Sequence, residues 1–586
     1  MRFNCGDKIQ VRLKSKAACS LNQVKFRFEI QFQDGSKVGT MFTEEDISYS
    51  EKELKNNYLG GSLMKKRPNI LLITSDQQHF NTIGAFNKEI ITPNLDRLVR
   101  EGTTFDRAYC PNPTCTPTRG SIITGKYPSQ HGAWTLGVKL PETENTIGNE
   151  FRKAGYKSAL IGKAHFQPLA STPEFPSLEA YPCLQDLEFW RSYKDIFYGF
   201  DHVELARNHT NEAHVGQHYA LWLEEKGCKN WRDYYLEPTG NMSEKEYPRL
   251  EILVEQEGNI LNSRRNWGKW EIPEKYHYNT WIAERTNKML EEYKNNDESF
   301  FLWASFFDPH PEYFVPEPWA SMYDPEKLTI NGLVPGEHLK NPPHFQKTQE
   351  ENPNFDEYKE TGFGIHGMHS HLQKIEDIKK DLALYYGMVS MMDKYIGEIL
   401  NKLDELGLAE DTIVVFTTDH GHFVGQHGLI RKGPFHYEDL IKVPFIVRYP
   451  NHVPENKVSS SIQSLVDLAP TFLSFCDLKI PYDMTGIDQK KVWENPDLEV
   501  RDHAICENHH EPTTIHLKTY VDKRYKITVY YNKTYGELYD LQEDPNEINN
   551  LWDNEDYKEL KSELLLKYIW AELGKEPMWM PRIKQA

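Results

Sequence analysis

The chain has 586 residues, a formal net charge of −19 at pH 7 and a mean hydropathy of −0.68. The acidic excess argues against nucleic acid or an anionic membrane surface as a partner recognised through bulk charge. No stretch approaches the ~20 apolar residues that span a bilayer, so we expect no membrane partner. An anionic substrate would need a local cluster of cations inside this acidic protein.

The N-terminal residues 1–64 differ in pattern from the rest. From Val24 to Phe32 apolar and polar side chains alternate, which is typical of a strand with one buried face. Asp34-Gly35 follows as a hairpin turn signal, and a second extended stretch reaches Phe42. The pattern predicts a small β appendage of unknown role. The alternative is that the start is misplaced and Met64 opens the protein.

The N-terminal residues suggest the compartment, and the cysteines exclude two kinds of site. The first sixteen residues contain no apolar signal core and no small-residue cleavage site. We therefore expect a cytoplasmic protein, or a periplasmic one if a signal has been removed. The eight cysteines are sparse and form no CxxC pair, so neither a disulfide framework nor a zinc ribbon is indicated.

Residues 65–494 are predicted to form one α/β domain. Short apolar runs typical of buried parallel strands alternate with stretches of helical periodicity. This order predicts a mainly parallel sheet sandwiched by helices, with the functional site beyond the carboxyl ends of the strands. The predicted strands are 69–74, 159–161, 300–306, 412–417 and 443–447, and the predicted helices begin at Thr92-Pro93 or cover 147–154, 382–406 and 462–475.

Two segments and the C-terminal part interrupt or extend this pattern. Residues 170–290 and 335–375 lack clear periodicity, and we expect both to be insertions that roof the pocket. Residues 495–586 are predicted to form a smaller α+β subdomain and tail. Its extended stretches indicate an antiparallel sheet, and helical spacing follows near 556–572.

A cysteine followed by proline and arginine stands at the start of a short predicted helix, in Cys115-Thr116-Pro117-Thr118-Arg119. The free N–H groups and positive dipole end of a helix N-terminus suit an anion. Arg119 adds a planar, permanently charged donor one turn later. A lone cysteine is usually core filler, so these neighbours carry the inference of an anion-binding site.

Two acid-bearing loops directly follow the first and the fourth predicted strands. The first contains Asp76-Gln77 and the second contains Asp419-His420. Loops at the ends of parallel strands can converge on one cation, with three oxygen ligands and one nitrogen. Oxygen ligands suit calcium or magnesium, whereas imidazole and amide shift the balance towards manganese or zinc. We expect one divalent metal, with calcium as first choice and manganese or zinc as alternatives.

Further basic side chains follow other predicted strands. Lys163 and His165 come after 159–161, His310 comes after 300–306, and Lys432 follows later. Each alone is more often an ordinary surface or core residue. Together, fixed cations and a proton donor would lower the cost of charge that develops on a transferred group and on its leaving oxygen.

These motifs together resemble the sulfatase family of the alkaline phosphatase superfamily. The segment from Cys115 to Gly132 is similar to the family signature C-x-P-x-R with its flanks, and Gly162-Lys163-Ala164-His165 is similar to its G-K-x-H motif. The stretch from Gly536 to Leu541 is typical of its C-terminal subdomains. The resemblance covers about Arg67 to Asn550 and implies an alkaline-phosphatase-like fold.

The resemblance also implies a modified nucleophile. In the family a formylglycine-generating enzyme oxidises the cysteine, here Cys115, to formylglycine. The aldehyde hydrates; one hydroxyl binds the metal and attacks sulfur, and the other later expels the ester. The implied metal ligands are Asp76, Gln77, Cys115, Asp419 and His420, and the implied catalytic residues are Cys115, Arg119, Lys163, His165, His310 and Lys432, of which His310 is placed to protonate the leaving oxygen.

One departure keeps a second function open. Many sulfatases have Asp-Asp where this chain has Asp76-Gln77, and the Asp-Gln version resembles the phosphonate monoester hydrolase branch. Lys163 and His165 favour a sulfatase instead. We expect hydrolysis of a small-molecule or carbohydrate sulfate ester, with phosphonate monoester or phosphodiester hydrolysis as the alternative.

A third hypothesis is a catalytically silent binding protein, but none of the motifs is broken as that hypothesis requires. The identity of the natural ester stays open, because the segments that would select it are the irregular insertions. A homo-oligomer is a further option, formed through the aromatic tail 568–580; the alternative is that this tail covers its own domain.

Overall fold

The computed structural model describes the backbone of three strands near the N-terminus and then residues 67–207, 212–235, 268–359, 367–510 and 514–584. The chain divides into two compact units, Met1–Arg67 and Pro68–Ala586. The predicted boundaries at 64/65 and 494/495 stay predictions. Among the described residues, no helix has both the length and the apolar character needed to cross a bilayer.

The first unit contains an antiparallel sheet of three strands in the order β1-β2-β3, which are Gln10–Ala18, Val24–Gln31 and Lys37–Phe42. The alternating stretch that began at Val24 does form a strand, and the second extended stretch pairs with it. The first strand was not predicted. The expected Asp34-Gly35 turn lies outside the described residues.

The second unit is built on an eight-stranded sheet in the order β16-β5-β15-β12-β4-β10-β7-β8. Five neighbouring strands, from β12 to β8, run parallel, whereas β15 is antiparallel to both of its neighbours. The predicted, mainly parallel sheet is therefore confirmed. Its strands are β4 (Asn69–Ser75), β5 (Thr103–Phe105), β7 (Lys157–Gly162), β8 (His202–Leu205), β10 (Phe300–Ser305), β12 (Thr412–Thr418), β15 (Phe445–Arg448) and β16 (Lys457–Ser459).

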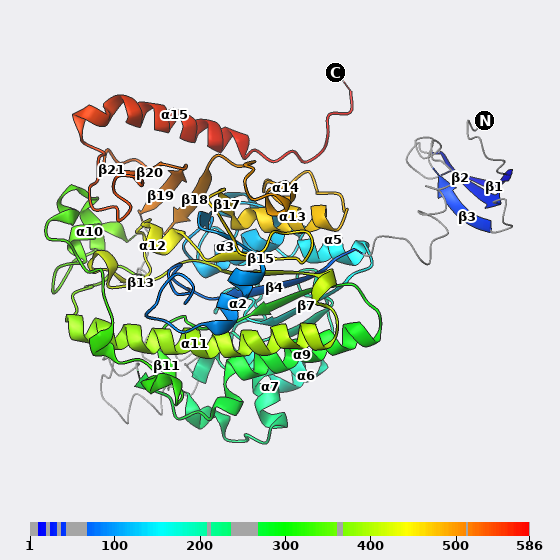
Figure 1. The fold of residues 1–586 in the computed structure, drawn as a ribbon, viewed down its shortest axis with the longest axis horizontal. Helices are drawn as coiled ribbons and strands as arrows, with labels where there is room; N and C mark the ends of the chain where they lie inside the picture. Colours follow the sequence, from blue (N-terminus) through cyan, green and yellow to red (C-terminus); the bar gives the residue numbers. More distant parts are fainter. Residues whose placement is uncertain are drawn as a thin grey trace. The chain divides into compact units, whose positions relative to one another are not determined.

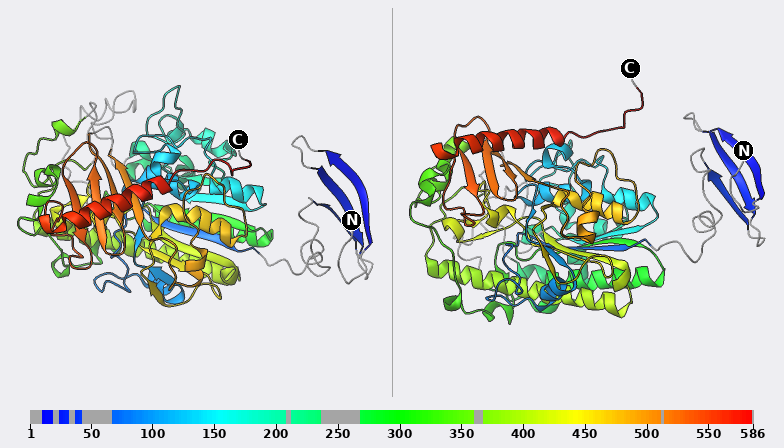
Figure 2. Two further views of the ribbon diagram at one scale, coloured as in Figure 1. Left: turned by 90° about the horizontal axis from the view of Figure 1, so that it is seen from above. Right: turned by 45° about the horizontal axis from the view of Figure 1, so that its top comes forward.

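Helices cover both faces of this sheet, because alternate side chains of its central strands enter two different cores. Ile70 and Leu72 of β4 belong to one core, and Leu71 and Ile73 belong to the other. The first core packs against α3 (Cys115–Thr124), α5 (Ile147–Lys153) and α13 (Leu468–Phe475), and the second against α2 (Pro93–Glu101), α9 (Tyr278–Asn295) and α11 (Ile375–Glu405) (Figures 1 and 2).

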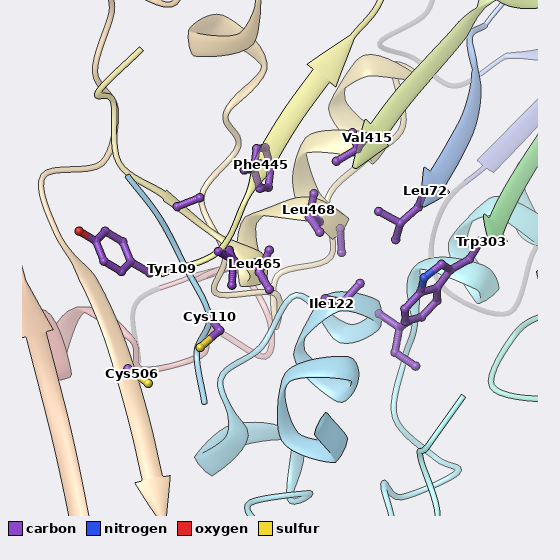
Figure 3. Close-up of a cluster of buried hydrophobic side chains, with 14 of the residues drawn as sticks. Leu72, Tyr109, Cys110, Ile122, Trp303, Val415, Phe445, Leu465, Leu468 and Cys506 are labelled. Atoms are coloured by element: carbon purple, nitrogen blue, oxygen red, sulfur yellow. The ribbon is translucent and has the colours of Figure 1, made fainter. Parts of the chain in front are cut away.

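Figure 3 shows the first core in detail. Leu72, Trp303 and Val415 extend from three adjacent strands into the same cluster as Ile122 of α3 and Leu468 of α13. All five side chains are at most 2% exposed. Burial of such large apolar side chains contributes roughly 1.5–3 kcal/mol each relative to exposure, so this core fixes α3, and with it Cys115, against the sheet.

The C-terminal part forms a four-stranded antiparallel sheet, as predicted: β18 (Ala504–His509), β19 (His516–Val521), β20 (Tyr525–Tyr530) and β21 (Gly536–Asp540). Helix α15 (Lys558–Gly574) packs on this sheet through Leu564 and Ala571 (Figures 1 and 2). Glu507 N donates to Pro111 O at 2.7 Å, so β18 is joined to the loop that precedes α3.

Two expectations are corrected. The helix predicted over 462–475 begins at Leu468, because Gln463–Ser464 forms strand β17 and Ser464 caps the turn that follows. The range 170–290 is not simply an insertion, because it contains strand β8 of the main sheet and most of helix α9, and its role as a roof over the pocket stays a prediction. Its residues 236–267 lie outside the described part.

The remaining described strands and α-helices are short. They are β6 (Ala108–Tyr109), β9 (Gly268–Lys269), β11 (Phe314–Val315), β13 (Phe423–Val424), β14 (Ile430–Arg431), α4 (Pro128–His131), α6 (Leu187–Ser192), α7 (Gln217–Glu225), α10 (Pro343–Lys347), α12 (Glu438–Ile441) and α14 (Lys490–Glu494).

Candidate active site

The candidate site lies where the parallel strands end. Asp76 directly follows β4, Asp419 follows β12 and Lys163 follows β7, and these strands lie within four consecutive positions of the sheet. Helix α3 begins at Cys115 beside them, since its thiol contacts Asp76. The carboxyl ends of neighbouring parallel strands open at one edge of the sheet, which is why loops distant in sequence meet there.

Cys115 is 1% exposed and is surrounded by polar groups. Its Sγ lies 3.2 Å from Lys432 Nζ, 3.3 Å from His420 Nε2 and 3.7 Å from Asp76 Oδ1. Burial raises the pKa of the Cys115 thiol, and the Asp76 carboxylate adds to this effect, although Lys163 and Lys432 oppose it. The unmodified thiol is therefore poorly suited to act as a thiolate nucleophile.

Four of the predicted metal ligands converge as expected. Asp76, Cys115, Asp419 and His420 each offer one ligand atom, and these atoms all lie within 4.8 Å of one another. Gln77 Oε1 is buried without a hydrogen-bond partner among the described residues. Two carboxylates and an imidazole fit a divalent cation, as does an orphaned buried amide oxygen on a residue whose N–H bonds to Asp419, because oxygen and imidazole donors suit calcium, manganese or zinc.

His420 has the tautomer that a metal ligand requires. Its Nδ1 lies 3.0 Å from Gly421 O, so Nδ1 carries the proton and Nε2 presents a lone pair to the site. Burial lowers the pKa of His420 to about 4, which keeps the ring neutral near pH 7. Asp419 Oδ1 accepts hydrogen bonds of 3.0 Å from both Gln77 N and His420 N, so one carboxylate joins the two loops that carry the candidate metal ligands.

Arg119 and Lys163 balance the two aspartates. Arg119 Nε donates to Asp419 Oδ2 at 2.9 Å, and Lys163 Nζ donates to Asp76 Oδ2. Burial alone would raise the pKa of Asp76, but the charges of Lys163, Arg119 and Lys432 outweigh it and hold that pKa far below its usual value. The Asp76 carboxylate is therefore ionised at neutral pH.

His165 and His310 lie in loops at the same edge of the sheet. The backbone of His165 is left-handed, with φ 58°, and its Nδ1 is buried without a partner among the described residues. Burial and then the charge of Arg207 lower the pKa of His165 well below its usual value. His310 follows β10 and is partly buried, and its ring shares a hydrogen bond with Pro311 O. Contacts of either ring with a substrate stay predictions.

Arg207 was missed by the sequence analysis. It follows β8, whose Leu205 pairs with Gly162 of β7, so the register brings Arg207 level with the Lys163–His165 segment. It is 6% exposed, and its Nη1 donates to Glu179 Oε2 at 3.2 Å. The sequence did contain a signal for Arg207, because a basic residue follows the short alternating stretch of β8. The sequence analysis did not predict that strand and therefore missed the arginine.

A second missed group supports Gln77. His422 stacks on Tyr385 with ring centres 4.9 Å apart, and its Nδ1 lies 2.7 Å from Gln77 Nε2. Its position two residues after His420 was the only signal in the sequence. Nothing in the spacing shows that the loop turns back towards Gln77.

The comparisons with known proteins agree with this geometry. The sulfatase family model matches residues 68–478, and a model described as N-sulphoglucosamine sulphohydrolase, C-terminal, matches residues 425–572. An arylsulfatase of Clostridium perfringens is 29% identical over 517 residues, which cover 87% of this chain and 95% of that protein. An N-acetylglucosamine-6-O-sulfatase of Bacteroides thetaiotaomicron is 27% identical and covers 85% of each chain.

Solved structures show the same fold. The phosphonate monoester hydrolase of Agrobacterium radiobacter superposes with a TM-score of 0.68 at 23% identity, over 87% of this chain and 96% of that one. At this identity the likeness establishes the alkaline-phosphatase-like architecture and leaves the reaction to be argued from the site.

Proposed function

This chain belongs to the sulfatase family of hydrolases, and we propose that it hydrolyses a sulfate ester through a formylglycine made from Cys115. The observation that carries the proposal is the surroundings of Cys115. A buried cysteine with a raised pKa is a poor nucleophile, yet it lies within 3.7 Å of a lysine, an imidazole and a carboxylate. Conversion of the thiol to an aldehyde resolves this conflict, because the hydrated aldehyde supplies a hydroxyl nucleophile.

The chemistry proceeds in two steps. One hydroxyl of the hydrate attacks sulfur, the sulfur–oxygen bond of the ester breaks, and the departing oxygen takes a proton. The second hydroxyl then loses its proton, the bond between carbon and the sulfated oxygen breaks, and sulfate leaves as the aldehyde re-forms. Water hydrates the aldehyde again, so no oxidant or reductant is consumed in a turnover.

The cations of the site are suited to hold the charge of the transferred group. Lys432 Nζ lies next to Cys115 and 3.3 Å from His420 Nε2, and Lys163 Nζ lies 4.0 Å from Cys115 Sγ. Preorganised donors of this kind are each worth roughly 10²–10³ in kcat. We assign His310 as the acid that protonates the leaving oxygen, because it follows the strand between β4 and β7.

Asp76, Gln77, Asp419 and His420 would hold one divalent metal together with the modified residue 115. When bound, such a cation supplies a fixed positive charge and lowers the pKa of a hydroxyl at the site. Calcium is our first choice, with manganese or zinc as alternatives because of the imidazole and amide donors.

A second candidate function is hydrolysis of a phosphonate monoester or a phosphodiester. Gln77 favours it, since the amide stands where many sulfatases have a second aspartate. The 0.68 TM-score to a phosphonate monoester hydrolase is compatible with it but establishes the fold alone. The Lys163 and His165 positions favour the sulfate ester, and relatives named for carbohydrate sulfates suggest a sulfated saccharide as the substrate class.

The experiment that tests the proposal follows the modification of Cys115 and the activity together. The full chain is produced with and without a formylglycine-generating enzyme, and the fraction of aldehyde at position 115 is measured by peptide mass spectrometry. We expect hydrolysis of an aryl sulfate to rise in proportion to the aldehyde fraction. Equal activity in unconverted protein would show that the thiol or another group is the nucleophile.

A further inference from the structure

The amide of Gln77 has two chemically different ends, and only its oxygen can bind a metal. Gln77 Nε2 lies 2.7 Å from His422 Nδ1, whereas Gln77 Oε1 has no partner among the described residues. Both side chains are at most 1% exposed, so water does not compensate for a misplaced donor. The orientation of the amide therefore depends on whether His422 Nδ1 accepts or donates a hydrogen bond. If Nδ1 accepts, the amide nitrogen faces His422 and the oxygen is free to face the metal ligands.

The ring of His422 is held from two sides. Its Nε2 shares a hydrogen bond with the Tyr313 hydroxyl, and its face stacks on Tyr385 with 16° between the planes. When Nε2 carries the proton and donates it to Tyr313, Nδ1 has a lone pair and must accept from an N–H group. Burial, and after it the negative charge of Asp381, raises the pKa of Tyr313 well above its usual value, so the hydroxyl keeps its proton and its neutral oxygen can accept from His422 Nε2.

The backbone of Gln77 is held by Tyr385, the residue on which His422 stacks. Tyr385 Oη donates to Gln77 O at 2.9 Å and accepts from His79 N at 2.8 Å. Gln77 itself is left-handed, with φ 59°, a conformation that a non-glycine residue keeps only when its surroundings impose it. Tyr385 thus holds the main chain of Gln77, while His422 contacts its side chain.

We propose that His422 is a positioning residue, which accepts a hydrogen bond from the Gln77 amide and thereby turns the amide oxygen towards the metal. The inference rests on the proposed function in one respect, because it requires that the site holds a divalent cation. It also explains why glutamine can stand at this position. A carboxylate has two equivalent oxygens and needs no such orientation, whereas an amide does.

The test is the affinity of the full chain for Mn²⁺ and Ca²⁺, measured by calorimetry rather than by activity. His422→Phe keeps a ring to stack on Tyr385 but has no acceptor, and we expect a 10- to 100-fold loss of affinity, about the size found when partners of metal ligands are removed. His422→Asn places an oxygen where Nδ1 stood, and we expect it to recover most of that loss. A merely structural role would not distinguish these variants in this way.

The matched background is Gln77→Glu, whose symmetrical carboxylate needs no orienting partner. In this background His422→Phe should cost little affinity. If His422→Phe is folded and binds metal as tightly as the unchanged chain, or loses the same affinity in both backgrounds, the positioning role is wrong. If His422→Phe fails to fold, Tyr313→Phe provides the test, because it removes the hydrogen-bond partner of His422 Nε2. We expect Tyr313→Phe to lower the metal affinity several-fold, and an unchanged metal affinity would overturn the proposal. An unchanged chain that binds neither ion would instead refute the metal site of the proposed function.

Discussion

Lys432 Nζ lies 3.2 Å from Cys115 Sγ, although 317 positions separate the two residues in the chain. Lys432 is 2% exposed and comes directly after the two-residue strand β14, which pairs with β13, the strand that follows the Asp419-His420 loop. Two lysines from distant segments therefore approach the same sulfur, since Lys163 Nζ lies 4.0 Å from Cys115 Sγ.

Removal of this lysine should affect catalysis more than folding. We expect Lys432→Ala to lower kcat by roughly 10²–10³, because a fixed donor next to the transferred group is lost. Steady-state kinetics on an aryl sulfate measures the change, with Lys479→Ala as a control in which an exposed lysine is removed. An unchanged kcat in Lys432→Ala would show that Lys432 does not take part in the reaction.

Arg207 provides a second kinetic prediction. Its guanidinium is largely buried beside the Lys163–His165 segment and has one described hydrogen bond, to Glu179. If it contributes positive charge to the substrate pocket, Arg207→Met should reduce kcat/KM for sulfate esters by about 10-fold or more, the usual effect of losing a hydrogen bond to a charged group. Arg191→Met, at an exposed arginine, should leave kcat/KM unchanged. Loss of thermal stability without a kinetic effect would show that the Arg207–Glu179 pair is only structural.

Much of the site could be predicted because the strands that carry it are continuous apolar runs. Such runs identify strand ends, and polar residues at the ends of neighbouring parallel strands must meet. Asp76, Lys163 and Asp419 were found in this way. Strand β8 has only four residues and no such run, so Arg207 behind it was missed. Helix α9 was missed for a similar reason, since it begins inside an aperiodic segment.

His422 could not be predicted, because its role depends on a close approach of two loops. Gly421 N donates to Leu440 O at 2.8 Å, and His422 N donates to Asp439 O at 3.0 Å. A Cβ atom at Gly421 would lie 2.1 Å from Asp439 O, so only glycine permits this approach. The turn directs His422 towards Gln77, and neither periodicity nor spacing contains that information.

A buried histidine outside the site makes stability depend on pH. His427 Nδ1 lies 3.1 Å from Glu337 Oε1, and its Nε2 lies 3.3 Å from Asp439 Oδ2. Burial alone would lower the pKa of His427, but these two carboxylates outweigh it and raise the pKa to about 9. The protonated ring therefore stabilises the fold fully below pH ~6.5, and this contribution is lost as the pH rises towards 9.

The corresponding variant is His427→Asn, since asparagine tolerates the left-handed backbone of this residue, whose φ is 56°. Denaturant unfolding between pH 6 and pH 10 should show a difference in unfolding free energy between the unchanged chain and the variant. We expect this difference to shrink by roughly 3 kcal/mol across the range. A difference that is independent of pH would mean that His427 is neutral in the folded protein.

The link between the C-terminal sheet and the main domain gives a stability prediction. Arg501, just before β18, forms two hydrogen bonds with Asp467, from Nε at 2.8 Å and from Nη2 at 2.5 Å. Both side chains are at most 3% exposed. Arg501→Met leaves a buried carboxylate unpaired and should cost about 3–5 kcal/mol of unfolding free energy. The double variant with Asp467→Asn should regain part of this loss in urea unfolding, and equal stability of the single variant and the unchanged chain would contradict the argument.

The central claim is sulfate ester hydrolysis at a modified Cys115, and the most direct test is kcat/KM measured side by side on three substrates. These are an aryl sulfate, an aryl phosphonate monoester and an aryl phosphodiester, each with calcium, manganese and zinc. The enzyme is produced with a formylglycine-generating enzyme, and Cys115→Ala gives the background. We predict that the sulfate is preferred by several decades and that Cys115→Ala is inactive on all three substrates. A preference for a phosphorus ester, or activity retained by Cys115→Ala, would contradict this account.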